Sequence, residues 1–487
     1  MKSPIMTGNK IYKTITFIFI SCYSLVSYGQ TESLRANRIR TDRYRQDFTF
    51  FRNILQDKYP SLYRYADKMK MDTVLDSSYA SINERTSDLE FYKMFKILLS
   101  KMKDGHLYCS LPPAFETYRN EKALFFPVKL KFINSKVFVE FALNSQIPTG
   151  SEIISINNQP TNAVITELLK YIVSDGNIQT KKYQILNNFF YFYYFIAFGE
   201  TPSFNVVYKL KNGQIRSSKI MADLERNIIK DEIAELAQPL LDFSVKPNHI
   251  ALMTIKSFNP AELKIDFNDF LENSFQKIEV LNIKKLIIDF RGNGGGRDTY
   301  GSLLYSYLAN KPFTYYKNLQ TVTMEMEFDK FKNNVSSFNN LTPKMFKKVN
   351  DHQFLLGKEA HPNLEVIYPH QNYNGEVWFL IDGSSFSTTA EFCAIAYSNK
   401  RGKFIGEETG GTYDGNTSGV QYEIVLPNTK MEISFGTIRY EMDVNRAKEI
   451  GRGIIPQYKV QSTILDIINK NDVQLNLAML LAGQKNN

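Results

Sequence analysis

The sequence predicts an α/β domain with a mostly parallel sheet, preceded by an N-terminal helical domain and a β-rich module. Three successive patterns along the 487 residues lead to this prediction. Apolar residues recur at helical spacing over residues 47–102, whereas strand-like runs and a hairpin signal, Asn212-Gly213, fill residues 117–222. From His249 onward, apolar runs alternate with helical patterns, as in the β-α-β units of parallel sheets.

The helical domain is expected over residues 30–116. Its apolar residues lie three or four positions apart, and Tyr59-Pro60 divides them into two groups. The groups are Phe48, Phe51, Ile54 and Leu55, and then Phe91, Met94, Phe95, Leu98 and Leu99. Because this spacing places the side chains on one face of a helix, we expect a small helical domain.

The β-rich module is expected over residues 117–222. Its strand candidates are Phe126–Phe132, Val137–Phe141, Glu152–Ile156 and Phe204–Leu210, with a helix near Ala163–Ile172. Within the module, Phe189–Phe198 is almost entirely aromatic. This segment is either a buried element under the module or a wall that contacts a peptide or a membrane, and burial is the simpler interpretation.

The α/β domain is expected over residues 223–487. Its candidates for buried strands are Ile250–Ile255, Leu286–Phe290, Val377–Ile381 and Phe404–Ile405, with helices between them. The polar stretch Met324–Gln371 interrupts the alternation, so we interpret it as an insertion.

The first 29 residues have the features of a signal peptide. A basic flank ends at Lys13, an apolar run follows, and the small residues Ser27 and Gly29 predict cleavage before Gln30. The alternatives are a retained anchor, although the run is too short to span a bilayer, and a lipoprotein cut at Cys22, although the lipobox is poor. We therefore expect an exported protein, periplasmic or extracellular, with membrane association only if Cys22 is lipidated.

The composition predicts a folded, soluble globular protein. Hydrophobic residues make up 43% and charged residues 22% of the chain, which excludes collagen-like, disordered and small disulfide-framework classes. The net charge of +9 is not gathered in a Lys/Arg-rich block, so no nucleic-acid binding is expected. After cleavage only Cys109 and Cys393 remain, and their spacing leaves open whether they pair.

The first segment that carries chemistry is Leu286–Gly296, where an apolar strand runs into a glycine-rich turn. Glycine allows a sharp bend that leaves backbone amides uncovered, as an oxyanion hole and a phosphate cradle both require. The lack of a Walker motif or a G-x-G-x-x-G pattern disfavours a nucleotide site. A tight turn without chemistry is the remaining alternative.

The second segment is Val377–Ile381, a strand that is followed by the polar run Asp382–Glu391 and a helical pattern. Ser387 lies where the strand passes into the helix, and the helix dipole favours developing negative charge there. It is therefore a candidate nucleophile. Because serine and threonine are also preferred N-caps, capping is the competing interpretation.

The third segment is Asp104-Gly105-His106. Of the five histidines, only His106 combines a turn with a neighbouring acid, although a lone histidine is usually a solvated or core residue. No His-x-x-x-His, Cys-x-x-Cys or carboxylate cluster indicates a metal site, and no cofactor is expected.

Together, these segments resemble the S41 family of serine peptidases, which contains the C-terminal processing peptidases and the tricorn core. The matching stretches, in family order, are Leu286–Gly296 (D-x-R-x-N-x-G-G, through Asp289, Arg291, Asn293 and Gly295), Val377–Glu391 (the nucleophile segment), Ile405–Gly411 (G-x-x-T-x-G) and Gly453–Pro456 (G-[VI]-x-P). The resemblance implies an α/β catalytic domain of the ClpP/crotonase-like type. Residues 117–222 resemble the PDZ-like module of many members, which captures an extended peptide by strand addition.

Departures from the family pattern indicate the branch. Processing peptidases carry a lysine base directly after G-x-x-T-x-G, where this chain has Thr412. The tricorn-like branch instead takes a histidine from a D-G-H turn, so the resemblance implies His106 as the base for Ser387. Thr388 is a minor rival nucleophile, because Glu391 lies one residue further along than the acid of most relatives.

The acidic third residue is implied less directly. In this branch a glutamate precedes the closing segment, which implies Glu449, here shifted by one residue. Glu441 and Asp443 are the substitutes. The usual aspartate after the closing proline is Gln457 in this chain.

The resemblance thus implies an exported serine peptidase that acts on polypeptides or peptides. His106 would remove the Ser387 proton, and the amides of Gly294 or Gly295 and of Thr388 would hold the oxyanion. The alternative is a non-catalytic protein that binds peptides or other ligands on the same scaffold. An esterase or lipase is disfavoured because no G-x-S-x-G elbow is present.

Overall fold

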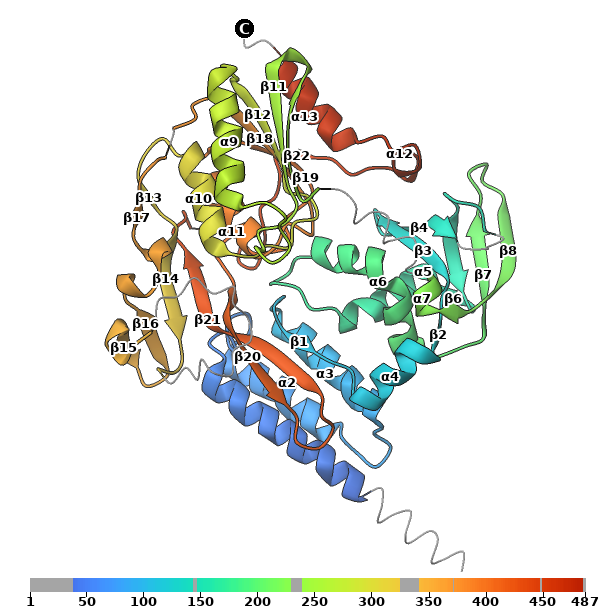
Figure 1. The fold of residues 1–487 in the computed structure, drawn as a ribbon. Helices are drawn as coiled ribbons and strands as arrows, with labels where there is room; N and C mark the ends of the chain where they lie inside the picture. Colours follow the sequence, from blue (N-terminus) through green and yellow to red (C-terminus); the bar gives the residue numbers. More distant parts are fainter. Residues whose placement is uncertain are drawn as a thin grey trace, which may run out of the picture.

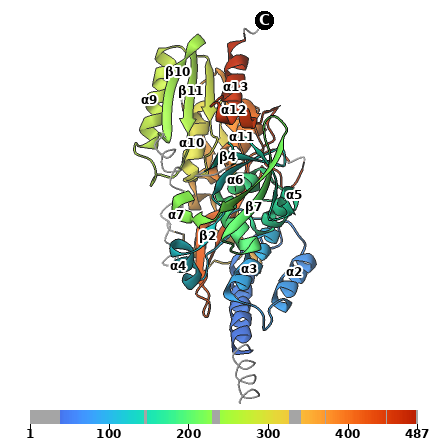
Figure 2. The same ribbon diagram turned by 90° about the vertical axis from the view of Figure 1, so that its right-hand side faces the viewer.

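The computed structural model describes residues 38–142, 147–228, 239–324, 341–370, 372–446 and 449–484. The predicted signal peptide, with Cys22 and the cleavage position before Gln30, lies outside the described residues. N-terminal helices, a β-rich module and a larger part around an α/β sheet make up the molecule (Figure 1). The side view shows an elongated shape, with the N-terminal helices at one end and the α/β sheet at the other (Figure 2).

The N-terminal helices lie over residues 38–58, in α2 (Lys68–Ala80) and in α3 (Asp88–Met102). α3 ends at Lys103, which adopts a left-handed backbone conformation with φ 58°. The chain then turns through Asp104-Gly105-His106 into β1 (Tyr108–Cys109), which pairs antiparallel with β21 (Glu432–Met442). A helix end and a strand pair therefore fix the histidine turn from both sides.

The β-rich module is an antiparallel sheet with helices packed against it. Its strands run in the order β3 (Val128–Ile133), β4 (Lys136–Ala142), β5 (Glu152–Ile156), β7 (Ser203–Lys209) and β8 (Ile215–Met221), with β6 (Gln159–Pro160) paired to β5. Two helices, α5 (Thr161–Leu168) and α6 (Thr180–Phe198), connect β6 to β7. The aromatic segment Phe189–Phe198 lies on α6, where most of its rings are buried against the sheet, as in the simpler of its two interpretations.

The small paired strands β2 (Leu124–Phe125) and β9 (Asp223–Leu224) and the helices α4 (Pro113–Glu121) and α7 (Glu225–Ile228) complete this region. Arg119 of α4 donates to the carboxylate of Glu225 of α7 (Nε to Oε2, 2.9 Å), which closes the module at this end.

The α/β part is built on a second six-stranded sheet. In order across the sheet, its strands are β10 (Leu241–Lys246), β11 (Ile250–Ile255), β12 (Lys285–Asp289), β18 (Glu376–Ile381), β19 (Lys403–Gly406) and β22 (Tyr458–Lys459). The β10–β11 pair is antiparallel and the four other pairs are parallel. Three helices, α9 (Phe267–Val280), α10 (Asp298–Leu308) and α11 (Thr388–Ser398), cover one face, and α13 (Val473–Gly483) covers the other (Figure 1).

Coverage of both faces explains why the central strands are continuous apolar runs. Since β12 and β18 are parallel neighbours, their carboxyl ends lie at the same edge of the sheet. The glycine-rich turn that follows β12 therefore lies beside the Ser387 turn that follows β18.

A long hairpin connects the α/β part with the N-terminal helices. Its strands, β20 (Thr417–Val425) and β21, run between the two regions (Figure 1). β21 also pairs with β14 (Tyr316–Thr321), which leads to β16 (Gln353–Leu356) and β15 (Phe346–Asn350) in the same sheet. Apolar residues near the tip, such as Phe435, enter one core with the N-terminal helices and the β-rich module. This core continues across the boundary expected near residue 117. It holds the N-terminal helices and the β-rich module against the hairpin of the α/β part.

Cys109 and Cys393 are both buried and do not form a disulfide. They lie in different cores, Cys109 with the N-terminal helices and Cys393 on α11 beneath the α/β sheet. In the part of the chain that the structure describes, no helix is both long and apolar enough to cross a membrane.

Candidate active site

The turn between β18 and α11 holds Ser387 in a strained backbone conformation. Ser387 has φ 53° and ψ −128°, a region that costs a residue with a side chain about 1–3 kcal/mol. Ser387 occupies the N-cap position of α11, but its hydroxyl caps no amide of the helix. A serine on a strained strand-to-helix turn is typical of nucleophiles. The capping interpretation of Ser387 is therefore wrong.

Asp382 fixes the chain that leads to Ser387. Its carboxylate accepts hydrogen bonds from the amides of Gly292, Ser384 and Ser385, at distances between 2.9 and 3.2 Å. Burial raises the pKa of Asp382, although the amides of Gly292 and Ser384 oppose this effect. Because Gly292 belongs to the glycine-rich turn, one carboxylate connects both turns.

The glycine-rich turn packs directly against Ser387. A Cβ atom on Gly295, which has φ 103°, would lie 2.7 Å from Cβ of Ser387 and 3.0 Å from the amide nitrogen of Thr388. The Gly295 amide already donates to Oδ1 of Asn293 at 2.9 Å. The amides of Gly294 and Thr388, by contrast, have no acceptor among the described residues. Both amides can therefore bind an incoming oxygen.

The hydroxyl of Thr388 is engaged in the fold. The residue is buried, and Oγ1 donates to the carbonyl oxygen of Gly296 at 2.8 Å. A buried hydroxyl that already donates is a poor nucleophile, which leaves Ser387 as the candidate. Further along α11, Glu391 hydrogen-bonds to Tyr316 (2.8 Å) and Asn416 (2.6 Å), and burial raises the pKa of Glu391 to about 8.

Arg291 anchors the glycine-rich turn to the last helix. Its guanidinium donates to the carboxylates of Asp289 and Asp472, at 2.7 to 2.9 Å, and Asp472 caps α13. Burial raises the pKa of Asp289, but the neighbouring guanidinium outweighs this effect and holds the pKa below its usual value. Asp289 and Arg291 therefore shape the turn rather than supply a proton donor.

His106, which follows the N-terminal helices, contacts the turn before α11 that carries Ser387 (residues 382–387, here called the nucleophile turn). Its ring stacks on Phe386, the residue before Ser387, with ring centroids 4.4 Å apart and planes inclined by 31°. Nδ1 lies 3.6 Å from Oδ1 of Asp104. Both ring nitrogens are buried, and neither makes a hydrogen bond to another described residue. Catalytic hydrogen bonds are often long in a free enzyme and shorten when substrate binds.

Asp104 is the acid that faces His106. Its buried carboxylate accepts hydrogen bonds from the Tyr59 hydroxyl (2.5 Å) and from the His106 amide (2.8 Å). Burial raises the pKa of Asp104, but the imidazole of His106 and the hydroxyl of Tyr59 outweigh this effect and hold the pKa below its usual value. A buried carboxylate that stays ionised can orient an imidazole and stabilise the imidazolium.

A second carboxylate, Asp175, lies in the loop before α6. Oδ1 accepts the Gly105 amide at 2.6 Å, whereas Oδ2 has no hydrogen-bond partner among the described residues although the residue is only 1% exposed. Burial and the nearby charge of Asp104 raise the pKa of Asp175.

The carboxylates and the imidazole around the histidine turn are groups of the kinds that bind metal ions. Asp104, His106 and Asp175 each offer one atom, and the three atoms lie within 4.8 Å of one another. However, the cationic groups of Lys181 and Arg64 already face both carboxylates. We therefore infer that Lys181 and Arg64, and not a metal ion, balance the negative charge of the two carboxylates.

The glutamate that the resemblance implied, Glu449, does not serve His106. Its side chain is 66% exposed and pairs with Arg452 at 3.3 Å, because the closing segment turns this carboxylate toward solvent. Among the substitutes, Glu441 hydrogen-bonds to neighbours on β14 and Asp443 is exposed. The structure therefore corrects the implied third residue.

Sequence reasoning missed Tyr59, Asp175 and Lys181, which surround the histidine turn. None of them belongs to a sequence motif. Tyr59 follows the first N-terminal helix, Asp175 lies in the loop before α6, and Lys181 lies on α6. Only the fold brings these segments together, so the sequence offered no signal that could have selected them.

Known proteins share this fold. Residues 249–460 match the model of peptidase family S41. A crystal structure of a CPAF point mutant is 13% identical, with 91% of this chain and 97% of that chain covered and a TM-score of 0.66. Mature CPAF is 14% identical, with 91% and 97% covered and a TM-score of 0.62. At these identities the likeness shows the fold alone, and comparison with curated protein sequences gives no match.

Proposed function

We propose that this chain, whose residues 249–460 match the model of peptidase family S41, is a serine peptidase that hydrolyses peptide bonds through an acyl-enzyme on Ser387, with His106 as general base. The observation that carries this proposal is the stacking of His106 on Phe386, next to Ser387. The strained backbone of Ser387 supports the same assignment.

The proposed reaction begins with proton transfer from Ser387 to His106. Since Nδ1 faces Asp104, the other ring nitrogen, Nε2, takes the proton while the serine oxygen attacks the peptide carbonyl. The imidazolium then gives the proton to the leaving amine. In the second half of the reaction, His106 takes a proton from water, the water oxygen attacks the acyl group, and the proton passes to the departing Ser387 oxygen. Asp104 takes the place of the third residue in this scheme, since its carboxylate keeps its charge beside the imidazolium.

The amides of Gly294 and Thr388 are proposed to bind the oxyanion. The Gly295 amide is a weaker candidate than the sequence implied, because Asn293 already accepts its hydrogen. Loss of one oxyanion donor typically costs about 2.7–4 kcal/mol of transition-state stabilisation.

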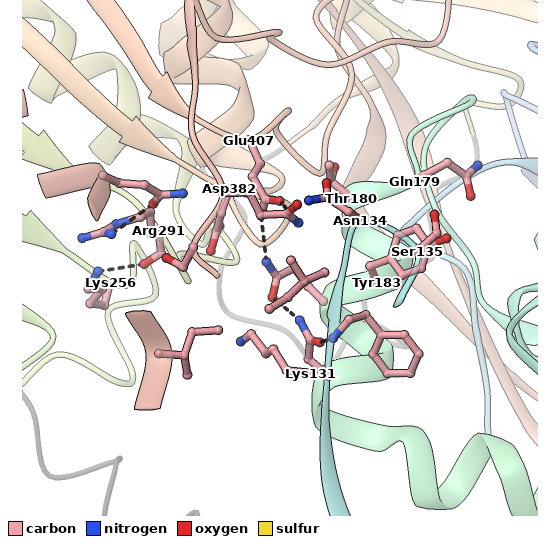
Figure 3. A pocket seen from close by; sticks show the side chains of 18 residues that line it. Lys131, Asn134, Ser135, Gln179, Thr180, Tyr183, Lys256, Arg291, Asp382 and Glu407 are labelled. Carbon is pink, nitrogen blue, oxygen red and sulfur yellow. Dashed lines mark hydrogen bonds between the residues drawn. The ribbon is translucent and has the colours of Figure 1, made fainter. Parts of the chain in front are cut away.

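The β-rich module, residues 117–222, is proposed to be PDZ-like and to hold the polypeptide substrate. β3 is an edge strand of its sheet, and α6 packs beside it. A pocket of about 470 Å³ lies between the end of β3 and the start of α6, and Asp382 and Glu407 of the α/β part also line it (Figure 3). An extended chain added to the edge of β3 would enter this pocket beside the nucleophile turn.

We further propose that residues 30–116 and 223–487 are the helical and catalytic domains and that the protein is exported. The signal features before Gln30 support export, and lipidation at Cys22 is the alternative that would add a membrane anchor. Mass spectrometry of the mature protein tests this: a mature chain that begins at Gln30 supports cleavage there, and a retained leader contradicts it.

Two substitutions test the catalytic assignment. We expect Ser387→Ala and His106→Ala each to lower kcat on an unfolded protein substrate by at least about 10⁴-fold, because each removes one member of a unit. Circular dichroism and thermal unfolding should show an unchanged fold. Matched controls are Ser384→Ala, a hydroxyl on the same turn, and His352→Ala, an exposed histidine. Undiminished turnover in either catalytic variant would refute the assignment.

A fluorophosphonate probe separates the peptidase from the binding-only alternative. The strained, accessible Ser387 of a peptidase should be labelled in the wild-type protein and not in Ser387→Ala. Saturable peptide binding without labelling and without turnover would favour the non-catalytic protein.

A further inference from the structure

Lys181, the second residue of α6, extends from the β-rich module into the candidate active site. Its Nζ atom lies 2.9 Å from the ring centroid of Phe386 and donates to the carbonyl oxygen of Gly105 at 3.2 Å. Phe386 precedes Ser387, and Gly105 precedes His106. One ammonium group therefore contacts both turns that carry the proposed chemistry.

Three loops pack closely against the start of α6, which restricts the position of the Lys181 side chain. A Cβ atom on Gly105 would lie 2.6 Å from Nζ of Lys181, and one on Gly410 would lie 3.3 Å from its Cβ. A Cβ atom on Gly383 would lie 2.4 Å from the carbonyl carbon of Thr180. Loops from the histidine turn, the nucleophile turn and the G-x-x-T-x-G stretch therefore converge on the start of α6.

The charges around Lys181 come from the elements packed against it. Asp104 and His106 lie on the histidine turn, and Asp175 lies on the loop before α6. Burial lowers the pKa of Lys181 to about 8, while the two carboxylates oppose this effect. The ammonium is therefore charged at neutral pH and loses its proton as the pH rises through about 8.

We propose that Lys181 is a positioning residue whose positive charge holds the His106 turn and the Phe386 ring in a fixed position relative to each other. This proposal rests on the proposed roles of Ser387 and His106. A cation over an aromatic ring is stabilised by the electrons of the ring, and a neutral amine is not. The hydrogen bond to Gly105 fixes the backbone of the histidine turn, so one side chain sets the distance between base and nucleophile.

The test compares Lys181→Met with Lys182→Met. Lys182 is the next residue of α6, and burial also lowers its pKa to about 8, but its Nζ donates to Ser100 and to the carbonyl oxygen of Leu169. We expect Lys181→Met to lower kcat on an unfolded protein substrate about tenfold at pH 7, with little change in KM. Lys182→Met should retain the wild-type kcat.

The pH profile distinguishes a charge from a space-filling role. Wild-type kcat should fall as the pH rises through about 8. This fall should be lost in Lys181→Met, retained in Lys182→Met and moved to higher pH in Lys181→Arg, because arginine stays charged. If Lys181→Met fails to fold, the Lys181→Arg profile decides. An unchanged alkaline fall in Lys181→Arg, or wild-type kcat in Lys181→Met, would overturn the proposal.

The same assay separates this proposal from the catalytic assignment. Inactive Ser387→Ala with fully active Lys181→Met refutes only the role of Lys181. Active Ser387→Ala refutes the catalytic assignment itself. A wild-type kcat that rises through pH 8, together with an inactive Lys181→Arg, would indicate a proton acceptor and overturn the positioning role.

Discussion

The nucleophile turn and the histidine turn are held in place by different means. Ser387 is positioned by its own backbone, by the close packing of Gly295 and by amides that bind Asp382. His106 is positioned by side chains from other segments. Tyr59 comes from the N-terminal region, while Asp175 and Lys181 come from the β-rich module.

This difference has consequences for chemistry and for pH response. The nucleophile turn lies within one β-strand-to-helix connection, and the neighbouring glycine-rich turn of the same sheet packs against it. The histidine turn needs the shared core that joins the N-terminal helices, the β-rich module and the hairpin tip. Because ionisable side chains surround it, we expect this turn to be the part of the site that responds to pH.

Among the substitutions that test this comparison of the two turns, the largest effect should come from Asp104→Asn, which tests whether the histidine turn contains its own acid. An amide cannot stabilise the imidazolium and favours the wrong tautomer of His106, so kcat should fall on the order of 10⁴-fold. Steady-state kinetics at neutral pH measures this loss. Glu449→Gln is the control, since the exposed Glu449 pairs with Arg452 and its loss should leave kcat unchanged. A reversed result would restore Glu449 as the third residue.

A smaller effect is expected from Gly295→Ala, which tests backbone control of the nucleophile turn. The added Cβ would lie 2.7 Å from Cβ of Ser387 in a residue with positive φ, so the serine must move. A displacement of about 1 Å can lower kcat about 10²-fold. Gly294→Ala keeps its amide and meets no atom within 4 Å, so it should retain far more activity. Equal kcat values in the two variants would contradict the packing argument.

The smallest effect is expected from Thr388→Val, which tests whether this hydroxyl is structural. The substitution removes the hydrogen bond to the Gly296 carbonyl and should lower the free energy of unfolding by about 1–2 kcal/mol. Chemical denaturation measures the stability, and labelling by the fluorophosphonate probe should persist. Loss of labelling with an intact fold would instead make Thr388 the nucleophile.

Much of the fold could be predicted from local patterns. The expected runs at Ile250–Ile255 and Val377–Ile381 coincide with or lie within β11 and β18, since a strand covered on both faces must be continuously apolar. The aromatic segment Phe189–Phe198 was ambiguous, because periodicity alone does not distinguish a buried helix from a buried strand. Packing of α6 against β3 decided the matter.

The sequence by itself determined the two turns that carry a serine and a histidine, because glycine placement and strand-to-helix junctions are local properties of the chain. Only the tertiary structure decided which side chains contact the histidine turn. Asp175 and Lys181 contact Gly105 although they lie far from it in the sequence, and the acid near the closing segment, Glu449, pairs with Arg452. Electrostatic partners depend on distance in space, and that distance is fixed only when the separate cores pack together.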